Sequence, residues 1–127
     1  MINPLFEAAM EGDIAGVEQA IADGISPNST DESGRTPLMV AVYKNRAMLA
    51  ETLIQHGANV NAKDKEGYSV IYYAGAHGNF ESLISLYENG AFFDKNDPSF
   101  VETLEIAKEN GHTHVVELLI AAEAKNK

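Results

Sequence analysis

Apolar and polar positions follow a pattern along this chain that repeats every 33 residues without a gap. The repeats start at Met1, Gly34, Gly67 and Phe100. Their fifth position is always aliphatic and their eighth is always alanine: Leu5, Leu38, Ile71 and Leu104, and then Ala8, Ala41, Ala74 and Ala107. A period of this length is typical of a solenoid, in which each unit buries its apolar face only by stacking on its neighbours. We therefore predict a single domain of four repeats, at 1–33, 34–66, 67–99 and 100–127.

Each repeat has the pattern of two short helices joined by a turn. In the second repeat, Thr36 can cap a first helix that starts at Pro37, where a missing N–H costs nothing. Asn45 stands where the other repeats have Gly, and it can adopt the left-handed conformation that ends this helix. Apolar residues at helical spacing predict a second helix over about 47–55, and the polar stretch 58–66 predicts an extended loop.

The whole pattern predicts an all-α solenoid of four helix-turn-helix units, with hairpin-like loops near residues 24–36, 57–69 and 90–102. Small residues in the first helices keep that layer thin, so the stack should curve and leave a concave side. The two end units should be capped by polar residues. Glu7 occupies a slot that is apolar or aromatic in the other repeats, and the polar residues 108–110 face outward at the other end.

Length and composition narrow the class of protein. With 127 residues and 45% apolar side chains, the chain has room for one folded core. Its longest apolar runs are too short to span a bilayer, and its first residues lack the basic and apolar segments of a signal peptide. We therefore predict a cytoplasmic monomer that binds no membrane; a mature exported chain whose leader has been removed is the alternative. The absence of cysteine excludes disulfides, thiol catalysis and thiolate metal sites.

Charge is unevenly distributed over the repeats, and the chain as a whole carries a net charge of −10. Residues 1–33 contain seven acidic residues and no Lys or Arg, whereas residues 34–66 contain five basic and three acidic residues. An acidic chain repels phosphate backbones, so we expect no nucleic-acid partner. The basic second repeat is a local exception.

Two segments of the second repeat, Gly34-Arg-Thr-Pro-Leu-Met-Val-Ala and Leu53-Ile-Gln-His-Gly-Ala-Asn-Val-Asn-Ala, resemble the ankyrin repeat. The resemblance covers essentially the whole chain, in four copies with both ends capped. It implies a stack of helix pairs with hairpin loops projecting at right angles, in a protein that binds other proteins. The sequence departs from the family pattern at Met39 and Tyr72, which replace the usual His, and in the irregular loop 92–99.

No motif of a conventional active site occurs in the sequence. There is no GxSxG, P-loop, GxGxxG or HExxH pattern. His112 and His114 are two residues apart, so on a helix they point in different directions instead of chelating together. Neighbouring carboxylates such as Asp31 and Glu32 indicate a solvated surface, because acid–base catalysis needs a partly dry pocket. We therefore expect no enzyme activity, no metal or other cofactor and no small-molecule substrate.

In the ankyrin family, partners are usually contacted through the hairpin tips and the outward residues of the first helices. The repeat register places the following candidate partner-binding residues on that surface: Met10, Glu11, Glu32, Arg35, Tyr43, Lys44, Lys63, Lys65, Tyr68, Ala76 and His77. Ile2 and Pro98 occupy corresponding repeat positions. Tyr and Arg side chains often carry binding energy, and four of the five basic residues of the second repeat belong to this set. The alternative interpretation is that these basic side chains only decorate solvated tips and balance neighbouring acids.

These patterns favour a non-catalytic module that binds a specific partner protein through its concave face and loop tips. A narrower hypothesis is a stoichiometric enzyme inhibitor or immunity protein, which blocks a partner's active site by occupancy alone. An enzyme of an unusual type is the alternative from another class.

Overall fold

The computed structural model describes residues 3–125, and the regular elements in that range are α helices. Their bounds are α1 Pro4–Glu11, α2 Ile14–Ala22, α3 Pro37–Tyr43, α4 Ala47–Gln55, α5 Val70–Gly75, α6 Phe80–Glu88, α7 Pro98–Glu109 and α8 Thr113–Ala124. The predicted all-α fold is confirmed. Not one of these helices combines the length and the apolar character that crossing a membrane requires.

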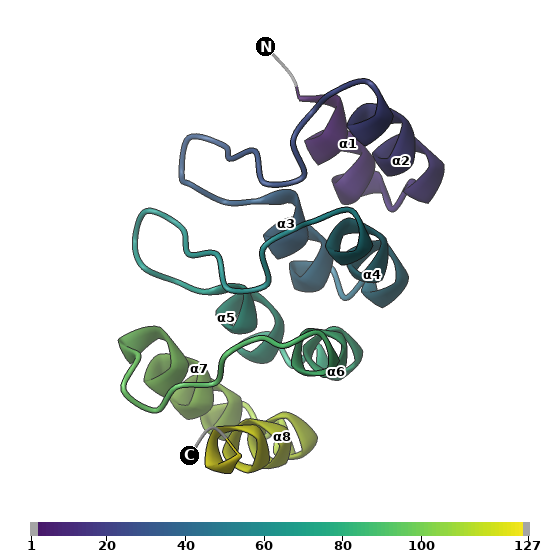
Figure 1. Ribbon diagram of the computed structural model, residues 1–127. Coiled ribbons are helices and arrows are strands. Elements are labelled where there is room, and N and C mark those ends of the chain that lie inside the picture. Colours follow the sequence, from purple (N-terminus) through teal and green to yellow (C-terminus); the bar gives the residue numbers. More distant parts are fainter. Residues whose placement is uncertain (1–2, 126–127) are drawn as a thin grey trace.

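The helices form two layers, and successive helix pairs stack from one end of the molecule to the other (Figure 1). In one layer α1, α3, α5 and α7 each pack against the next, and in the other α2, α4, α6 and α8 do the same. The loops that follow α2 and α4 project to one side as long hairpins (Figure 1). This arrangement is the predicted solenoid. We call the side formed by α1, α3, α5, α7 and the hairpins the inner face.

Side-chain caps begin the first helix of a unit, and a left-handed residue ends it. The Thr36 hydroxyl accepts a hydrogen bond from the Met39 N–H at 3.3 Å, and a proline follows the cap as predicted. Ser69 caps α5 in the same way by accepting from the Tyr72 N–H, so α5 forms without a proline. Asn45 has a φ of 55°, which confirms the predicted left-handed end of the first helix in the second unit.

The recurring apolar positions form one core between the two layers. Leu53, which the repeat places between units, is fully buried. The same is true of the large side chains that precede and follow it in the stack: Leu5, Leu38, Leu83, Leu86 and Leu119. Glu7 is exposed, as expected for an end unit that faces water. The periodicity therefore identified most of the packing positions, although Leu104 of the last unit is only partly buried.

Aspartates organise the two hairpins. The carboxylate of Asp31 accepts hydrogen bonds from the N–H groups of Ser33 and Arg35 at 2.9 Å each, and Asp64 accepts the equivalent pair in the second hairpin. The Lys65 N–H donates to the Ser33 carbonyl at 3.0 Å, which joins one hairpin to the next. The hairpin surface is thus tied together along the stack.

The third loop, predicted near 90–102, is present but shorter than predicted: it covers residues 89–97, because α7 already begins at Pro98. The Asp97 side chain accepts a hydrogen bond from the Ser99 N–H at 2.9 Å, and proline occupies the first helical position. These two residues form a strong helix start, which overrides the 33-residue register. As a result α7 runs for 12 residues, and Glu102, whose repeat position is the helix cap in the other three units, lies within the helix.

Candidate functional site

A groove crosses the inner face of the first two units. It encloses about 360 Å³ and lies between side chains of α1 and α3, next to the first hairpin. Its walls and rim include Phe6, Met10, Val40, Tyr43 and Tyr73, together with Arg35 and Lys44. We call it the inner groove. It brings together four of the predicted partner-binding residues: Met10, Arg35, Tyr43 and Lys44.

Two large apolar side chains of the groove are unusually open to solvent. Met10 is 53% exposed and Tyr43 is 50% exposed, and both stand at the same position of their repeats, near the end of an inner helix. The Tyr43 ring is held edge-on against the His77 ring, with centroids 4.6 Å apart. Glu11, the neighbour of Met10, is also exposed. Aromatic and Met side chains in such a position are typical of surfaces that bind other proteins.

Tyrosines of the third unit extend this aromatic surface. Tyr68 stacks on Tyr72 with ring centroids 4.2 Å apart, and Tyr72 meets the Tyr73 ring edge-on at 5.7 Å. The Tyr73 hydroxyl donates a hydrogen bond to the Asp64 carboxylate, which fixes its ring against the second hairpin. Burial and this hydrogen bond raise the pKa of Tyr73 above its ordinary value. The sequence interpretation selected Tyr68 but missed Tyr72 and Tyr73.

The charges at the inner groove are partly compensated within the protein. The Arg35 guanidinium pairs with Asp31 through an Nε–Oδ2 distance of 2.8 Å. Partial burial works to raise the pKa of Asp31, but the hydrogen bonds and the charge of Arg35 outweigh it and lower this pKa. Lys44 has no ion-pair partner among residues 3–125, so it supplies free positive charge at the rim.

His77 contributes an aromatic surface and not a charge at neutral pH. Burial lowers its pKa below the ordinary value, and the neighbouring His112 lowers it further. The imidazole is exposed to solvent on one side and contacts Tyr43 and Tyr72 on the other. His77 therefore joins the rings of the second and third units.

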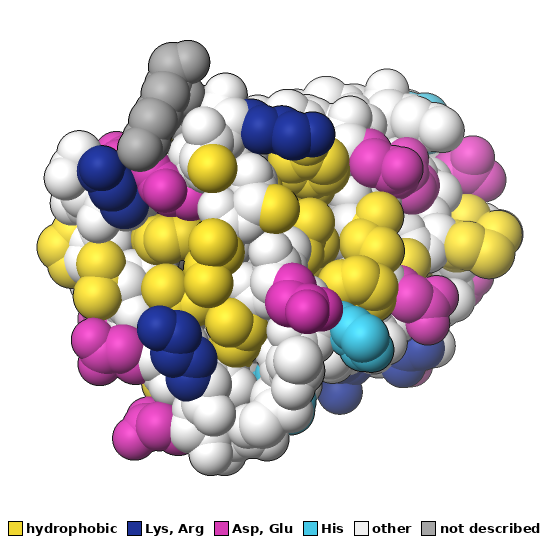
Figure 2. Space-filling model, turned by 90° about the horizontal axis from the view of Figure 1, so that it is seen from below, with side chains coloured by type: hydrophobic (Ala, Val, Ile, Leu, Met, Phe, Trp, Pro, Cys, Tyr) yellow, Lys and Arg dark blue, Asp and Glu magenta, His cyan; other side chains and the backbone are white. Residues whose placement is uncertain are grey.

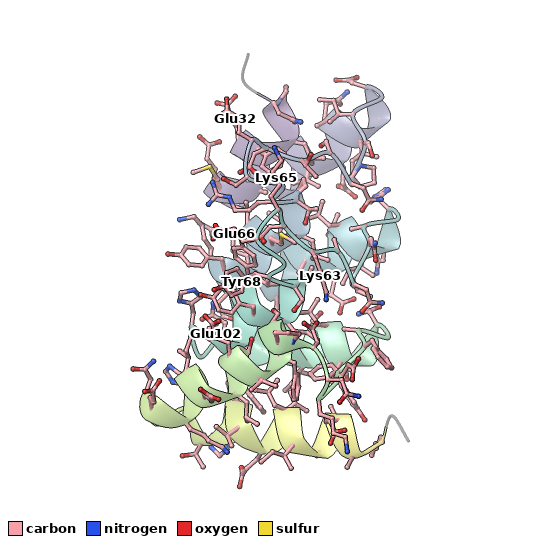
Figure 3. All side chains as sticks on the ribbon, turned by 90° about the vertical axis from the view of Figure 1, so that its left-hand side faces the viewer. Glu32, Lys63, Lys65, Glu66, Tyr68 and Glu102 are labelled. Atoms are coloured by element: carbon pink, nitrogen blue, oxygen red, sulfur yellow. The ribbon has the colours of Figure 1, made fainter. Side chains whose placement is uncertain are left out.

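The remaining predicted residues lie along the edge of the inner face that carries the hairpins. Figure 3 shows Glu32 and Lys65 near the tips of successive hairpins, with Tyr68 closer to α7. Lys63 lies on the other flank of the second hairpin and pairs with Asp97 at 3.0 Å. Lys63 is thus bound to the protein itself, whereas Glu32 and Lys65 are exposed without an ion-pair partner in the described part of the chain.

Two predicted surface positions need correction, and one cannot be placed. Ala76 is only 5% exposed, because its methyl group is too short to project from a position where Met10 and Tyr43 reach into solvent. Pro98 is not at a hairpin tip, since it begins α7. Ile2 lies outside the described residues.

Apolar side chains also spread across the C-terminal end of the stack, over α7 and α8 (Figure 2). Val101 is 41% exposed and Ile120 is 51% exposed, so this end is less polar than the repeat pattern predicts. A second hollow, of about 490 Å³, lies between the second hairpin and the loop before α7, and its walls combine polar side chains with apolar ones that include the exposed Phe92. Within residues 3–125, no group of three or more His, Asp or Glu side chains is arranged to hold a metal ion.

Comparisons with known proteins agree with this geometry. A family model described as ankyrin repeats, in three copies, matches residues 5–97. "Cyclin-dependent kinase 4 inhibitor B" of Bos taurus is 30% identical over 118 residues, which cover 92% of this chain and 89% of that protein. "Cyclin-dependent kinase inhibitor 2A" of Homo sapiens is 31% identical over 119 residues, which cover 93% of this chain and 76% of that protein. The solved structure of the human ASB11 ankyrin repeat domain matches with a TM-score of 0.83 at 26% identity, over 94% of this chain and 54% of that one.

Proposed function

Because the chain belongs to the ankyrin-repeat family, we propose that it binds one specific partner protein through the inner groove and the adjoining hairpin surface. The observation that carries this proposal is the pair of half-exposed side chains, Met10 and Tyr43, in a groove with a free cation at its rim. An apolar anchor of the partner can displace water from the groove, and Lys44 can attract an acidic group beside it.

The geometry suits binding by a preformed surface. Tyr43 is supported by the His77 ring, Tyr73 is held by Asp64, and Arg35 is held by Asp31. Because these side chains are already fixed, docking costs little conformational entropy at the groove. A module of this kind acts by occupancy and needs no catalytic group.

A second candidate function is stoichiometric inhibition of an enzyme, which is the same binding mode with an enzyme as the partner. It is favoured by the two relatives whose names describe cyclin-dependent kinase inhibitors and whose sequences align with most of this chain. In this form the inner face covers a functional surface of the enzyme, and full inhibition is reached at one molecule per enzyme.

Site-specific crosslinking tests the proposed surface. A photoreactive phenylalanine derivative replaces Tyr43 in one variant and Met48 in the other. Met48 is the matched control because it lies in the same unit on α4 and is 75% exposed. We expect one protein to be crosslinked from position 43 and not from position 48. Crosslinking of that protein from position 48 alone would place the site on the opposite face and overturn the proposal.

The captured protein then distinguishes simple binding from inhibition. If it is an enzyme, its activity is measured while the purified chain is added in increasing amounts. Inhibition requires a linear loss of activity that ends at a molar ratio of one. Unchanged activity at saturating amounts would refute inhibition and leave the binding module.

A further inference from the structure

A small cleft separates the tip of the second hairpin from the start of α7. It encloses about 270 Å³ and is lined by Glu66, Tyr68 and Glu102, with Lys63 and Asp97 at one side. We call it the hairpin cleft. Figure 3 shows the three lining side chains near one another on the edge of the inner face, with Lys63 on the other flank of the hairpin. The cleft is separate from the inner groove and shares no side chain with it.

The hairpin cleft has an unbalanced negative charge. Its one cation, Lys63, is paired with Asp97 at 3.0 Å, so these two charges cancel. Neither Glu66 nor Glu102 lies within ion-pairing distance of a Lys, Arg or His side chain in residues 3–125. The Glu102 carboxylate is nevertheless fixed, because the Tyr68 hydroxyl donates a hydrogen bond to it at 3.0 Å.

An aromatic platform lies beside these carboxylates. Tyr68 is stacked on Tyr72 at an interplanar angle of 30° and is tied to Glu102 through its hydroxyl. The hydrogen bond and charge of Glu102 raise the pKa of Tyr68, while burial and then Glu102 raise the pKa of Tyr72, so both phenols stay neutral. A cation at this place is attracted both by the face of the neutral ring, through a cation–π interaction, and by the negative charge of the two carboxylates beside it.

This arrangement arises from the departure of the fourth unit from the repeat. In the first three units the position of Glu102 is a helix cap, Asn3, Thr36 or Ser69. Because α7 starts at Pro98, this position is helical in the fourth unit and presents a long acidic side chain to the preceding hairpin. The cleft therefore depends on the shortened third loop and is not a general feature of the four units.

We propose that the hairpin cleft recognises an arginine side chain of the partner protein, with its guanidinium against Tyr68 and between Glu66 and Glu102. The planar guanidinium suits this site better than an ammonium group, since it can stack on a ring and donate to two carboxylates together. This inference rests on the proposed function, because the arginine belongs to the protein that the inner groove binds. The partner thus carries an apolar anchor for the groove and a basic residue for the cleft.

The test uses an arginine derivative and needs no knowledge of the partner. The full chain, labelled with ¹⁵N, is titrated with Nα-acetyl-arginine amide and, separately, with Nα-acetyl-citrulline amide, which has the same length and no charge. We expect saturable amide shifts at Gly67, Tyr68 and Glu102 with the arginine derivative. Equal shifts with citrulline would overturn the proposal. Shifts at these amides with calcium chloride, combined with none from arginine, would overturn it in favour of a metal site.

Isosteric variants identify the carboxylates that act. Glu102→Gln and Glu66→Gln should each weaken arginine binding by at least about fivefold, because each removes a charge-assisted hydrogen bond. Glu105→Gln is the control for the general acidity of the chain, since Glu105 is an exposed acid on α7 outside the cleft, and it should change affinity by less than about twofold. Equal effects of Glu102→Gln and Glu105→Gln would reduce the binding to nonspecific attraction and refute the site.

Different experimental results would refute the arginine site and the proposed function. Arginine bound at the cleft, with no protein crosslinked from position 43, would overturn the proposed function and leave the cleft as a cation site. A protein crosslinked from position 43, with no arginine shifts and no loss of affinity in Glu102→Gln, would overturn the cleft and leave the inner groove intact.

Discussion

Asn45 serves the fold in two ways, through its backbone and through its side chain. Its φ of 55° lies in the left-handed region, which the corresponding glycines of the other units adopt more easily. Its side-chain oxygen also accepts a hydrogen bond from the Ser82 hydroxyl at 3.0 Å, and Ser82 is fully buried in the next unit. The sequence indicated the first role, whereas the second depends on a residue 37 positions away.

We expect Asn45→Gly to lower the free energy of unfolding by about 1 kcal/mol, although glycine suits the backbone. The reason is that the buried Ser82 hydroxyl loses its partner, which costs more than the relief of left-handed backbone strain returns. Urea unfolding measures the change. The double variant Asn45→Gly/Ser82→Ala is the control, because removing both polar groups should recover most of the loss. A more stable Asn45→Gly variant would contradict this account.

Two apolar residues of α4 differ sharply in burial, and we expect them to differ equally in their contribution to stability. Leu53 is fully buried, whereas Met48 in the same helix is 75% exposed. Leu53→Ala should therefore lower stability by about 2–5 kcal/mol through lost burial and a residual cavity. Met48→Ala should change it by less than about 0.5 kcal/mol. Thermal and urea unfolding of both variants provide the measurement, and a reversed order would disprove the packing between units.

At the scale of elements, the start of α7 explains the main irregularity of the fold. Asp97 accepts from the Ser99 N–H and also pairs with Lys63, so one carboxylate both caps the helix and binds it to the second hairpin. This side chain is mostly shielded from solvent, at 17% exposure. The position of the hairpin cleft depends on this cap, because a later helix start would move Glu102 away from Tyr68.

Asp97→Ala should lower stability by about 0.5–2 kcal/mol, the usual cost of a lost helix cap. Asp97→Asn should cost less, since the amide oxygen can still cap α7 while the ion pair with Lys63 is lost. Lys63→Ala isolates the ion pair, which is worth about 0–1 kcal/mol at a partly exposed site. If Lys63→Ala cost as much as Asp97→Ala in urea unfolding, the ion pair and not the cap would define the start of α7.

Much of the architecture could be predicted from the sequence because it follows from local rules. The 33-residue period located the helices, Thr36 and Asn45 marked the ends of α3, and the apolar positions gave the core. The errors arose where one unit was inferred from another. Asp97 and Pro98 start α7 by their own chemistry, and Ala76 is buried because of its size. The repeat register alone predicts neither the early start of α7 nor the burial of Ala76.

The candidate site was predicted less completely, since its geometry depends on contacts between units. The sequence selected Tyr43, Lys44 and Arg35, which the fold does bring to one groove. It missed Tyr72 and Tyr73, which contact each other within α5 but are also fixed by residues of the second hairpin, Tyr72 through stacking on Tyr68 and Tyr73 through a hydrogen bond to Asp64. Their aromatic character was visible in the sequence, but the direction of their rings was set by Tyr68 and Asp64.

At the scale of the whole molecule, charge divides the inner face into distinct parts. The first unit is acidic, the inner groove has the free cation Lys44 at its rim, and the hairpin cleft near α7 carries Glu66 and Glu102. A partner segment that crosses this face meets the acidic first unit, the positive rim of the inner groove and the negative hairpin cleft in a fixed order. This order favours one orientation of docking and disfavours partners whose surface has a single sign of charge.

Substitutions on the two faces of the solenoid show which face binds the partner. Tyr43→Ala should reduce the binding free energy by about 2 kcal/mol or more, and mainly by raising the off-rate, because an anchor in a desolvated groove holds the complex once it has formed. Lys44→Ala should have a smaller effect, because a rim charge acts before contact. The variant should associate more slowly at low salt, and its difference from the unmodified protein should shrink at high salt, where the charge is screened. Met48→Ala on the opposite face is the matched control and should leave both rates unchanged. Surface plasmon resonance against the crosslinked partner, at low and high salt, separates these effects. If the losses occurred at Met48 and Glu51 on α4 and not at Tyr43, the partner would dock on the outer helices, and the rigid aromatic groove would have to be explained by the packing of the stack alone.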